Sequence, residues 1–150
     1  MASMCVLVVE DFAPFRQFVC STLAERRDVQ IIGEVADGLE AVQKTEILEP
    51  DFVFLDIGLP KLNGIDAARE IRKLAPKSKI IIVSQESSYE VVREAFNLGA
   101  WGYVLKTRAT FDLLAAMDAA VEGRHFLSAG LSIWNCTDAS PEHQSGIKAP

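Results

Sequence analysis

Five short apolar runs alternate with five segments of helical periodicity, and this alternation constrains the fold more than any other feature of the chain. Continuous apolar runs are typical of strands that are buried on both faces of a parallel sheet. Strict alternation of such strands with helices predicts an α/β fold, with three layers and a doubly wound five-stranded parallel sheet. The expected strands are Met4–Val9, Val29–Val35, Asp51–Leu55, Lys79–Val83 and Ala100–Leu105.

The segments between the strands carry apolar residues three and four positions apart, which places them on one face of a helix. Turn and capping residues mark the ends of these helices. Pro76 bounds the third helix, and Gly99 is expected to end the fourth. Ser87 or Ser88 is expected to cap the start of the fourth helix, and Thr110 the start of the fifth.

Length and composition favour a single folded domain. The chain has 150 residues, 49% of them hydrophobic, and a formal net charge of −6. The acidic balance argues against non-specific nucleic-acid binding by this chain. It has no apolar stretch long enough to cross a membrane, and its N-terminus does not resemble a secretory signal. Its three cysteines lack metal-ligand spacing, so we expect reduced thiols and a cytoplasmic location. The domain is predicted over residues 4–127, followed by a polar tail or linker over 128–150.

Polar residues follow four of the five expected strands. They are Glu10 and Asp11, Asp56, Ser84 and Lys106. The carboxyl ends of parallel strands meet at one edge of the sheet, where α/β proteins bind ligands. Three carboxylates at that edge would repel one another unless a cation binds, and Mg²⁺ favours such oxygen ligands. Lys106 can pair with Asp56 or with an anion attached to it. Each residue alone is more typical of a solvated turn or a cap, but their joint placement indicates a functional site.

Four motifs together resemble the response-regulator receiver domain of bacterial two-component systems, over roughly residues 4–125. They are Val8–Asp11, Leu55–Pro60 with Gly64, Ile82–Ser84 and Gly102–Lys106. The resemblance implies a flavodoxin-like receiver fold with strand order 2-1-3-4-5. In that order the first and third strands are neighbours, which brings their terminal acids together.

The resemblance also implies roles for the residues at the strand ends. Asp56 would accept a phosphoryl group from a sensor histidine kinase and form an aspartyl phosphate. Asp11, Asp56 and the Gly58 carbonyl would ligate Mg²⁺, and Glu10 would act largely through water. Lys106 and the metal would neutralise the charge of the transferring group. The chain would then be a signalling switch, catalysing only its own phosphorylation and dephosphorylation.

Further residues would transmit or tune the signal in a protein of this family. Ser84 would move to bond the acyl phosphate, and Tyr103 would turn inward into the vacated space. These movements would switch the surface formed by the fourth helix, fifth strand and fifth helix. Gly58, Gln85 and Glu86 occupy positions that tune the lifetime of the phosphate.

The chain departs from the usual receiver pattern at two positions beside the site. Gln85 stands where the family usually has Ala or Gly, and a longer side chain there could restrict access or bond the phosphoryl group. Thr107 follows Lys106 where Pro is usual. The family's peptide bond is typically cis at this point, but a cis bond before a non-proline residue costs about 3 kcal/mol. The sequence leaves open which isomer this chain adopts.

The stretch Gly99–Ala109 resembles the receiver subgroup that carries a helix-turn-helix DNA-binding output. No such output is visible in this sequence, so we expect no direct nucleic-acid binding by this chain. Homodimerisation stays open, through the first and fifth helices or through the fourth. The alternative function is a protein-interaction module that works without phosphorylation. Modules of that kind usually lose an acid, the acceptor or the lysine, and all of these are present here.

Overall fold

The computed structural model of the chain describes residues 3–131. Within this range six strands form one sheet in the order β2-β1-β3-β4-β5-β6, and every neighbouring pair is parallel. The strands are β1 (Met4–Val9), β2 (Val29–Val35), β3 (Phe52–Leu55), β4 (Lys79–Ser84), β5 (Gly102–Leu105) and β6 (Phe126–Leu127).

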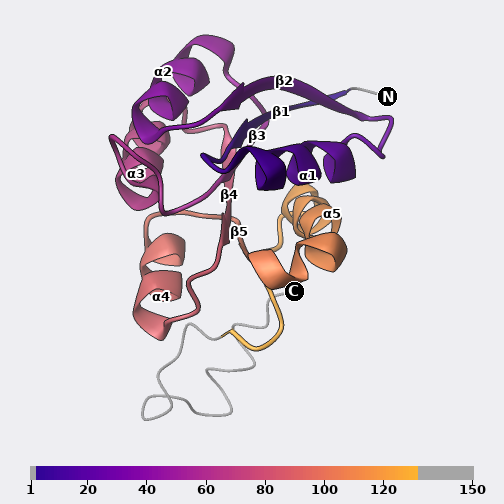
Figure 1. Cartoon of the computed structure of the whole chain (residues 1–150), viewed down its shortest axis with the longest axis vertical. Coiled ribbons are helices and arrows are strands. Elements are labelled where there is room, and N and C mark those ends of the chain that lie inside the picture. The colour runs from indigo at the N-terminus through magenta and orange to yellow at the C-terminus, as the bar shows by residue number, and fades with distance from the viewer. Residues whose placement is uncertain (1–2, 132–150) are drawn as a thin grey trace.

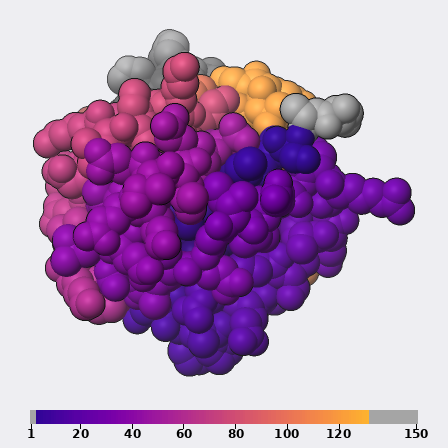
Figure 2. Space-filling view, turned by 90° about the horizontal axis from the view of Figure 1, so that it is seen from above, coloured from indigo at the N-terminus to yellow at the C-terminus, as the bar shows by residue number. Residues whose placement is uncertain are grey.

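Five helices cover the two faces of this sheet (Figure 1). On one face lie α1 (Ala13–Leu23) and α5 (Ala109–Val121), and on the other lie α2 (Gly38–Leu48), α3 (Gly64–Leu74) and α4 (Tyr89–Asn97). Seen from the side of α2 and β2, indigo to violet segments of the N-terminal half form most of the surface nearest the viewer (Figure 2). The predicted three-layer, doubly wound fold is therefore confirmed.

Strand β1 shows why the central runs are apolar without interruption. Its alternate residues Val6 and Val8 pack with α1 and α5, whereas Leu7 and Val9 pack with the helices on the opposite face. All four side chains are almost fully buried. Because successive side chains of a strand point to opposite faces, a strand covered on both faces needs apolar residues at every position.

Most predicted boundaries agree with the structure, and the exceptions have local causes. The first two strands match, β3 begins one residue later than expected, and β5 begins at Gly102. Ser88 caps α4 by accepting a hydrogen bond from the Val91 amide at 3.3 Å. The prediction that Thr110 caps α5 is wrong. A 3-10 turn over Lys106–Arg108 leads directly into the helix, so Arg108 occupies the cap position.

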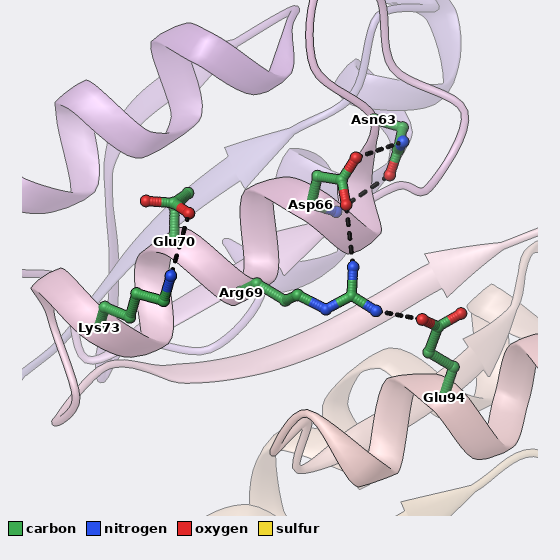
Figure 3. A network of polar contacts seen from close by, with 6 residues as sticks. All are labelled: Asn63, Asp66, Arg69, Glu70, Lys73 and Glu94. Carbon is green, nitrogen blue, oxygen red and sulfur yellow. Dashed lines mark hydrogen bonds and ion pairs between the residues drawn. The ribbon is translucent and has the colours of Figure 1, made fainter.

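Helix α3 is capped and is joined to α4 by polar side chains (Figure 3). The Asn63 side chain accepts from the Asp66 amide at 3.0 Å, which satisfies one of the free donors of the first turn. Arg69 of α3 bonds to Asp66 on its own helix and to Glu94 on α4. None of the helices described over residues 3–131 is long and apolar enough to cross a bilayer.

The sixth strand was not predicted from the sequence, because two apolar residues carry no periodicity. It pairs with β5 and leads to Ser128, whose side chain is buried. The Ser128 hydroxyl donates to Asp112 Oδ2 on α5 at 2.7 Å and accepts from the Leu105 amide at 3.0 Å. The described structure thus includes residues 128–131 of the segment that we expected to be a polar tail or linker. The remainder of that tail, residues 132–150, lies outside the described residues.

Replacing Ser128 with alanine is expected to lower the free energy of unfolding by about 1–3 kcal/mol. The substitution leaves the partly buried Leu105 amide without its acceptor and removes the donor to the buried Asp112 carboxylate. Urea denaturation measures the loss. Ser87→Ala, at an exposed serine, is the matched control and should change stability by less than about 0.5 kcal/mol. Equal stability of the two variants would contradict the structural role of Ser128.

Candidate functional site

The carboxyl ends of β1, β3, β4 and β5 meet at a cleft of about 350 Å³. This edge includes the point between β1 and β3 where the strand order reverses, the usual ligand position in a doubly wound sheet. The structure brings all five predicted strand-end residues to this cleft. Its lining includes Glu10, Asp11, Asp56, Gly58, Ser84, Gln85, Glu86 and Lys106.

Asp56 lies at the end of β3, with its backbone tied to the neighbouring strand. Its amide donates to the Val9 carbonyl at 3.1 Å, which continues the pairing of β1 and β3 by one residue. Its carboxylate oxygen Oδ1 accepts from the Ile57 amide at 2.8 Å. Only 6% of the residue is exposed, so this carboxylate is held in a defined orientation at the floor of the cleft.

The loop after Asp56 folds back closely on the end of β3. The Gly64 amide donates to the Ile57 carbonyl at 2.7 Å, and this bond closes the loop. A Cβ atom at position 64 would lie 2.0 Å from the Asp56 carbonyl oxygen. Glycine is therefore required for the approach that starts α3 beside the acid. The same loop places Gly58 at the mouth of the cleft, where a Cβ atom would meet nothing within 4 Å.

Lys106 reaches across the cleft from the end of β5 to two carboxylates. Its Nζ lies 2.8 Å from Glu10 Oε1 and 3.3 Å from Asp56 Oδ2. Burial tends to lower the pKa of Lys106, but the hydrogen bond to Glu10 and the charges of both acids outweigh it, so the pKa is raised. Burial raises the pKa of Glu10, and its bond to Lys106 offsets part of that increase. Lys106 is thus a fixed cation at this edge.

Glu10, Asp11 and Asp56 form an acidic cluster that suits a hard divalent cation. One carboxylate oxygen from each lies within 4.8 Å of the others. Glu10 and Asp56 are buried and Asp11 is exposed, so the cluster opens toward solvent. Oxygen donors of this kind, together with waters, are the ligands that Mg²⁺ prefers. The residues therefore fit the predicted metal, with the Gly58 backbone beside them in the cleft lining.

Ser84 and Tyr103 are linked through the backbone of Glu86. The Ser84 hydroxyl accepts from the Glu86 amide at 3.1 Å, and the Tyr103 hydroxyl donates to the Glu86 carbonyl at 2.8 Å. The Tyr103 side chain is fully buried, and burial raises its pKa to about 12. The ring already lies inward here, beside the segment that follows β4.

The structure shows where Gln85 lies and which isomer the peptide bond before Thr107 adopts, the two points at which the sequence departs from the receiver pattern. Gln85 is exposed and lines the cleft directly after Ser84, so its side chain stands at the entrance. No peptide bond among the described residues is cis, so the bond between Lys106 and Thr107 is trans.

Two aromatic residues at the site were missed by the sequence analysis. Phe12 lines the cleft, and its amide donates to Glu10 Oε2 at 3.0 Å. Phe15 of α1 places its ring 4.8 Å from Lys106 Nζ. The only local signal is that Phe15, in the first turn of α1, lies four residues after Asp11. Nothing in the sequence connects it to the lysine that follows the last strand of the expected sheet.

Sequence comparison relates this geometry to known proteins. A model of the response regulator receiver domain matches residues 6–118. The chemotaxis protein CheY of Thermotoga maritima is 39% identical over 101 residues, which cover 67% of this chain and 83% of CheY. The nitrate/nitrite response regulator NarL of Escherichia coli is 30% identical over 127 residues, 85% of this chain and 59% of NarL. The transcriptional regulatory protein PdtaR of Mycobacterium tuberculosis is 37% identical over 118 residues, 77% of this chain and 56% of PdtaR. The chain thus spans somewhat over half the length of these two regulators.

Solved structures agree with this relationship. A two-component response regulator of the LuxR family from Aurantimonas superimposes with a TM-score of 0.79 at 27% identity, covering 97% of this chain and 96% of that one. The RcsB response regulator of Salmonella typhimurium reaches a TM-score of 0.84 at 23% identity, covering 97% of this chain and 75% of RcsB, and it supports the fold alone.

Proposed function

Since this chain belongs to the response regulator receiver domain family, we propose that it is a phosphorylatable switch whose acceptor is Asp56. The observation that carries the proposal is the arrangement around this carboxylate. Asp56 lies within one cleft with Glu10 and Asp11, and the Lys106 ammonium is 3.3 Å from its Oδ2. A nucleophile, metal-ligating acids and a fixed cation are the groups that a phosphoryl-transfer site requires.

In the proposed reaction, a carboxylate oxygen of Asp56 attacks the phosphorus of a phosphohistidine on a sensor histidine kinase. The new oxygen–phosphorus bond forms as the phosphorus–nitrogen bond breaks. The electron pair of that bond stays on the imidazole nitrogen, which takes up a proton. The products are an aspartyl phosphate on this chain and a neutral histidine on the kinase. The bond from the Ile57 amide keeps Asp56 oriented for attack.

Charge neutralisation by fixed groups supplies most of the expected acceleration. Mg²⁺, held by Asp11, Asp56 and the Gly58 carbonyl, with Glu10 acting largely through water, would neutralise negative charge on the phosphoryl oxygens. Lys106 supplies a second positive charge from the opposite side of the cleft. Its ammonium already lies beside Asp56, so little reorganisation is needed when charge develops there.

Ser84, Tyr103 and the segment after β4 would convert phosphorylation into a surface change. The Ser84 hydroxyl would leave the Glu86 amide to donate to a phosphoryl oxygen. That movement would disturb the segment to which Tyr103 is bonded, and thus the start of α4. The face of α4, β5 and α5 would then shift between two states. Gly58, Gln85 and Glu86, at the rim of the cleft, would tune the lifetime of the phosphate.

We propose that this switch receives its signal from a kinase and passes it to a transcriptional output. The relatives NarL and PdtaR are a response regulator and a transcriptional regulatory protein by name. A sensor histidine kinase is the proposed phosphodonor partner, and control of transcription is the proposed output of the full protein. The second candidate, an interaction module that works without phosphorylation, is disfavoured because the acids, the acceptor and Lys106 are all in place.

Acetyl phosphate with Mg²⁺ provides the test, since it is a small phosphodonor that needs no kinase. We expect the intact mass to rise by one phosphoryl group, and we expect EDTA to prevent the rise. Peptide mapping after borohydride reduction should locate the modification at Asp56. Beryllofluoride with Mg²⁺ should perturb the amide resonances around the cleft. An unchanged mass together with no beryllofluoride response would favour the interaction module instead.

A further inference from the structure

The ammonium of Lys106 faces an aromatic ring as well as two acids. Its Nζ lies 4.8 Å from the centre of the Phe15 ring on α1. The Lys106 side chain is only 15% exposed, and Phe15 packs against the apolar core that α1 and α5 form with the sheet. A lysine ammonium over a ring face is attracted by the ring's quadrupole, and partial removal from water strengthens this attraction.

Of the three groups that contact the Lys106 ammonium, the two carboxylates can also ligate a metal ion, whereas the Phe15 ring cannot. Glu10 and Asp56, at 2.8 Å and 3.3 Å, belong to the acidic cluster that suits a divalent cation. When a cation engages these carboxylates, it competes with Lys106 for the negative charge of the same two side chains. The Phe15 ring cannot ligate a hard cation, because it offers no oxygen donor. Its contact with the ammonium therefore uses no oxygen that a cation needs.

We propose that Phe15 is a positioning residue that holds the Lys106 ammonium at the cleft through its ring face. The proposal rests on the proposed function of the site. When Glu10 and Asp56 bind a divalent cation, the Phe15 ring keeps the Lys106 ammonium close to the place where the phosphoryl group would arrive. Lys106 then need not be recruited from solvent during the reaction.

A purely packing role for Phe15 makes different predictions. Its ring also lies 5.6 Å from the Phe18 ring, so it contributes to the packing of α1. Packing depends on the size and shape of the side chain, whereas the attraction for an ammonium depends on electron density at the ring face. Fluorinated phenylalanines separate the two effects, because fluorine withdraws electron density while nearly preserving shape.

The experiment measures the rate of phosphorylation by acetyl phosphate at saturating Mg²⁺ in the full chain. We expect Phe15→Leu to slow the reaction about three- to tenfold. Mono-, di- and trifluorinated phenylalanine at position 15 should slow it in a graded series, and Phe15→Trp should retain the rate. Phe18→Leu is the matched control on the same helix and should react like the wild type. Mg²⁺ affinity should be unchanged throughout.

A spectroscopic measurement tests the positioning without any phosphorylation. In the wild type, the ring should shift the Lys106 ε-methylene resonances upfield, with and without Mg²⁺, and Phe15→Leu should abolish the shift. Absence of this shift in the wild type would overturn the proposal. A flat fluorination series, or equal slowing in the Phe15→Leu and Phe18→Leu variants, would also overturn it. If the wild type shows the shift but is not phosphorylated, the positioning stands and the proposed function fails.

Discussion

Asp56→Asn is expected to abolish phosphorylation of this chain by acetyl phosphate. The amide of asparagine is not a nucleophile at neutral pH, so no acyl phosphate can form at position 56. The two other acids of the acidic cluster do not replace it. Glu10 is occupied by Lys106 and the Phe12 amide, and Asp11 is exposed. Intact-mass measurement after incubation with Mg²⁺ and acetyl phosphate provides the readout. Asparagine has the shape of aspartate, so circular dichroism should show an unchanged fold.

Asp11→Asn provides the contrast at the same site. This variant keeps the acceptor but removes one charge from the acidic cluster, so it should weaken Mg²⁺ binding rather than remove the nucleophile. Phosphorylation should therefore return as the Mg²⁺ concentration is raised, whereas the Asp56→Asn variant should stay unmodified at any concentration. A phosphoryl group found on the Asp56→Asn variant would contradict the assignment of the acceptor.

Lys106→Met is expected to slow phosphorylation about 10²–10³-fold, the usual cost of losing one fixed group that stabilises developing charge. Methionine is similar in length to the apolar stem of lysine, so the change removes the charge more than the packing. Single-turnover kinetics with acetyl phosphate at saturating Mg²⁺ measure the loss. The mass shift should still appear after long incubation, because Asp56 and the acidic cluster remain.

The Lys106→Arg variant tests whether the positive charge alone is sufficient or whether the shape of the ammonium group also matters. The guanidinium keeps a positive charge but is planar and broader than an ammonium, so it cannot reproduce both the 2.8 Å and the 3.3 Å contacts. We expect a rate between those of the wild type and the Lys106→Met variant. A wild-type rate in the methionine variant would show that Lys106 takes no part in phosphoryl transfer.

The sequence predicts the structure correctly where the signal is a local residue pattern or a hydrophobic periodicity. The uninterrupted apolar residues of β1 required burial on both faces, and alternation with helices then required a parallel sheet. Parallel strands place their carboxyl ends together, so Asp56 and Lys106 were expected at one cleft although 50 residues separate them. Local signals failed at Thr110, where a 3-10 turn continues into α5, and at β6, where two residues carry no pattern.

The sequence by itself determined the fold class and the chemical groups at the strand ends, because periodicity and topology are enough to specify both. Only the tertiary structure decided how those groups pair. Lys106 pairs with Glu10 at 2.8 Å as well as with Asp56, and its ammonium contacts the Phe15 ring. The Ser128 hydroxyl donates a hydrogen bond to Asp112. These contacts join distant segments, and their distances depend on how helices α1 and α5 pack on the sheet. No spacing in the sequence encodes that packing.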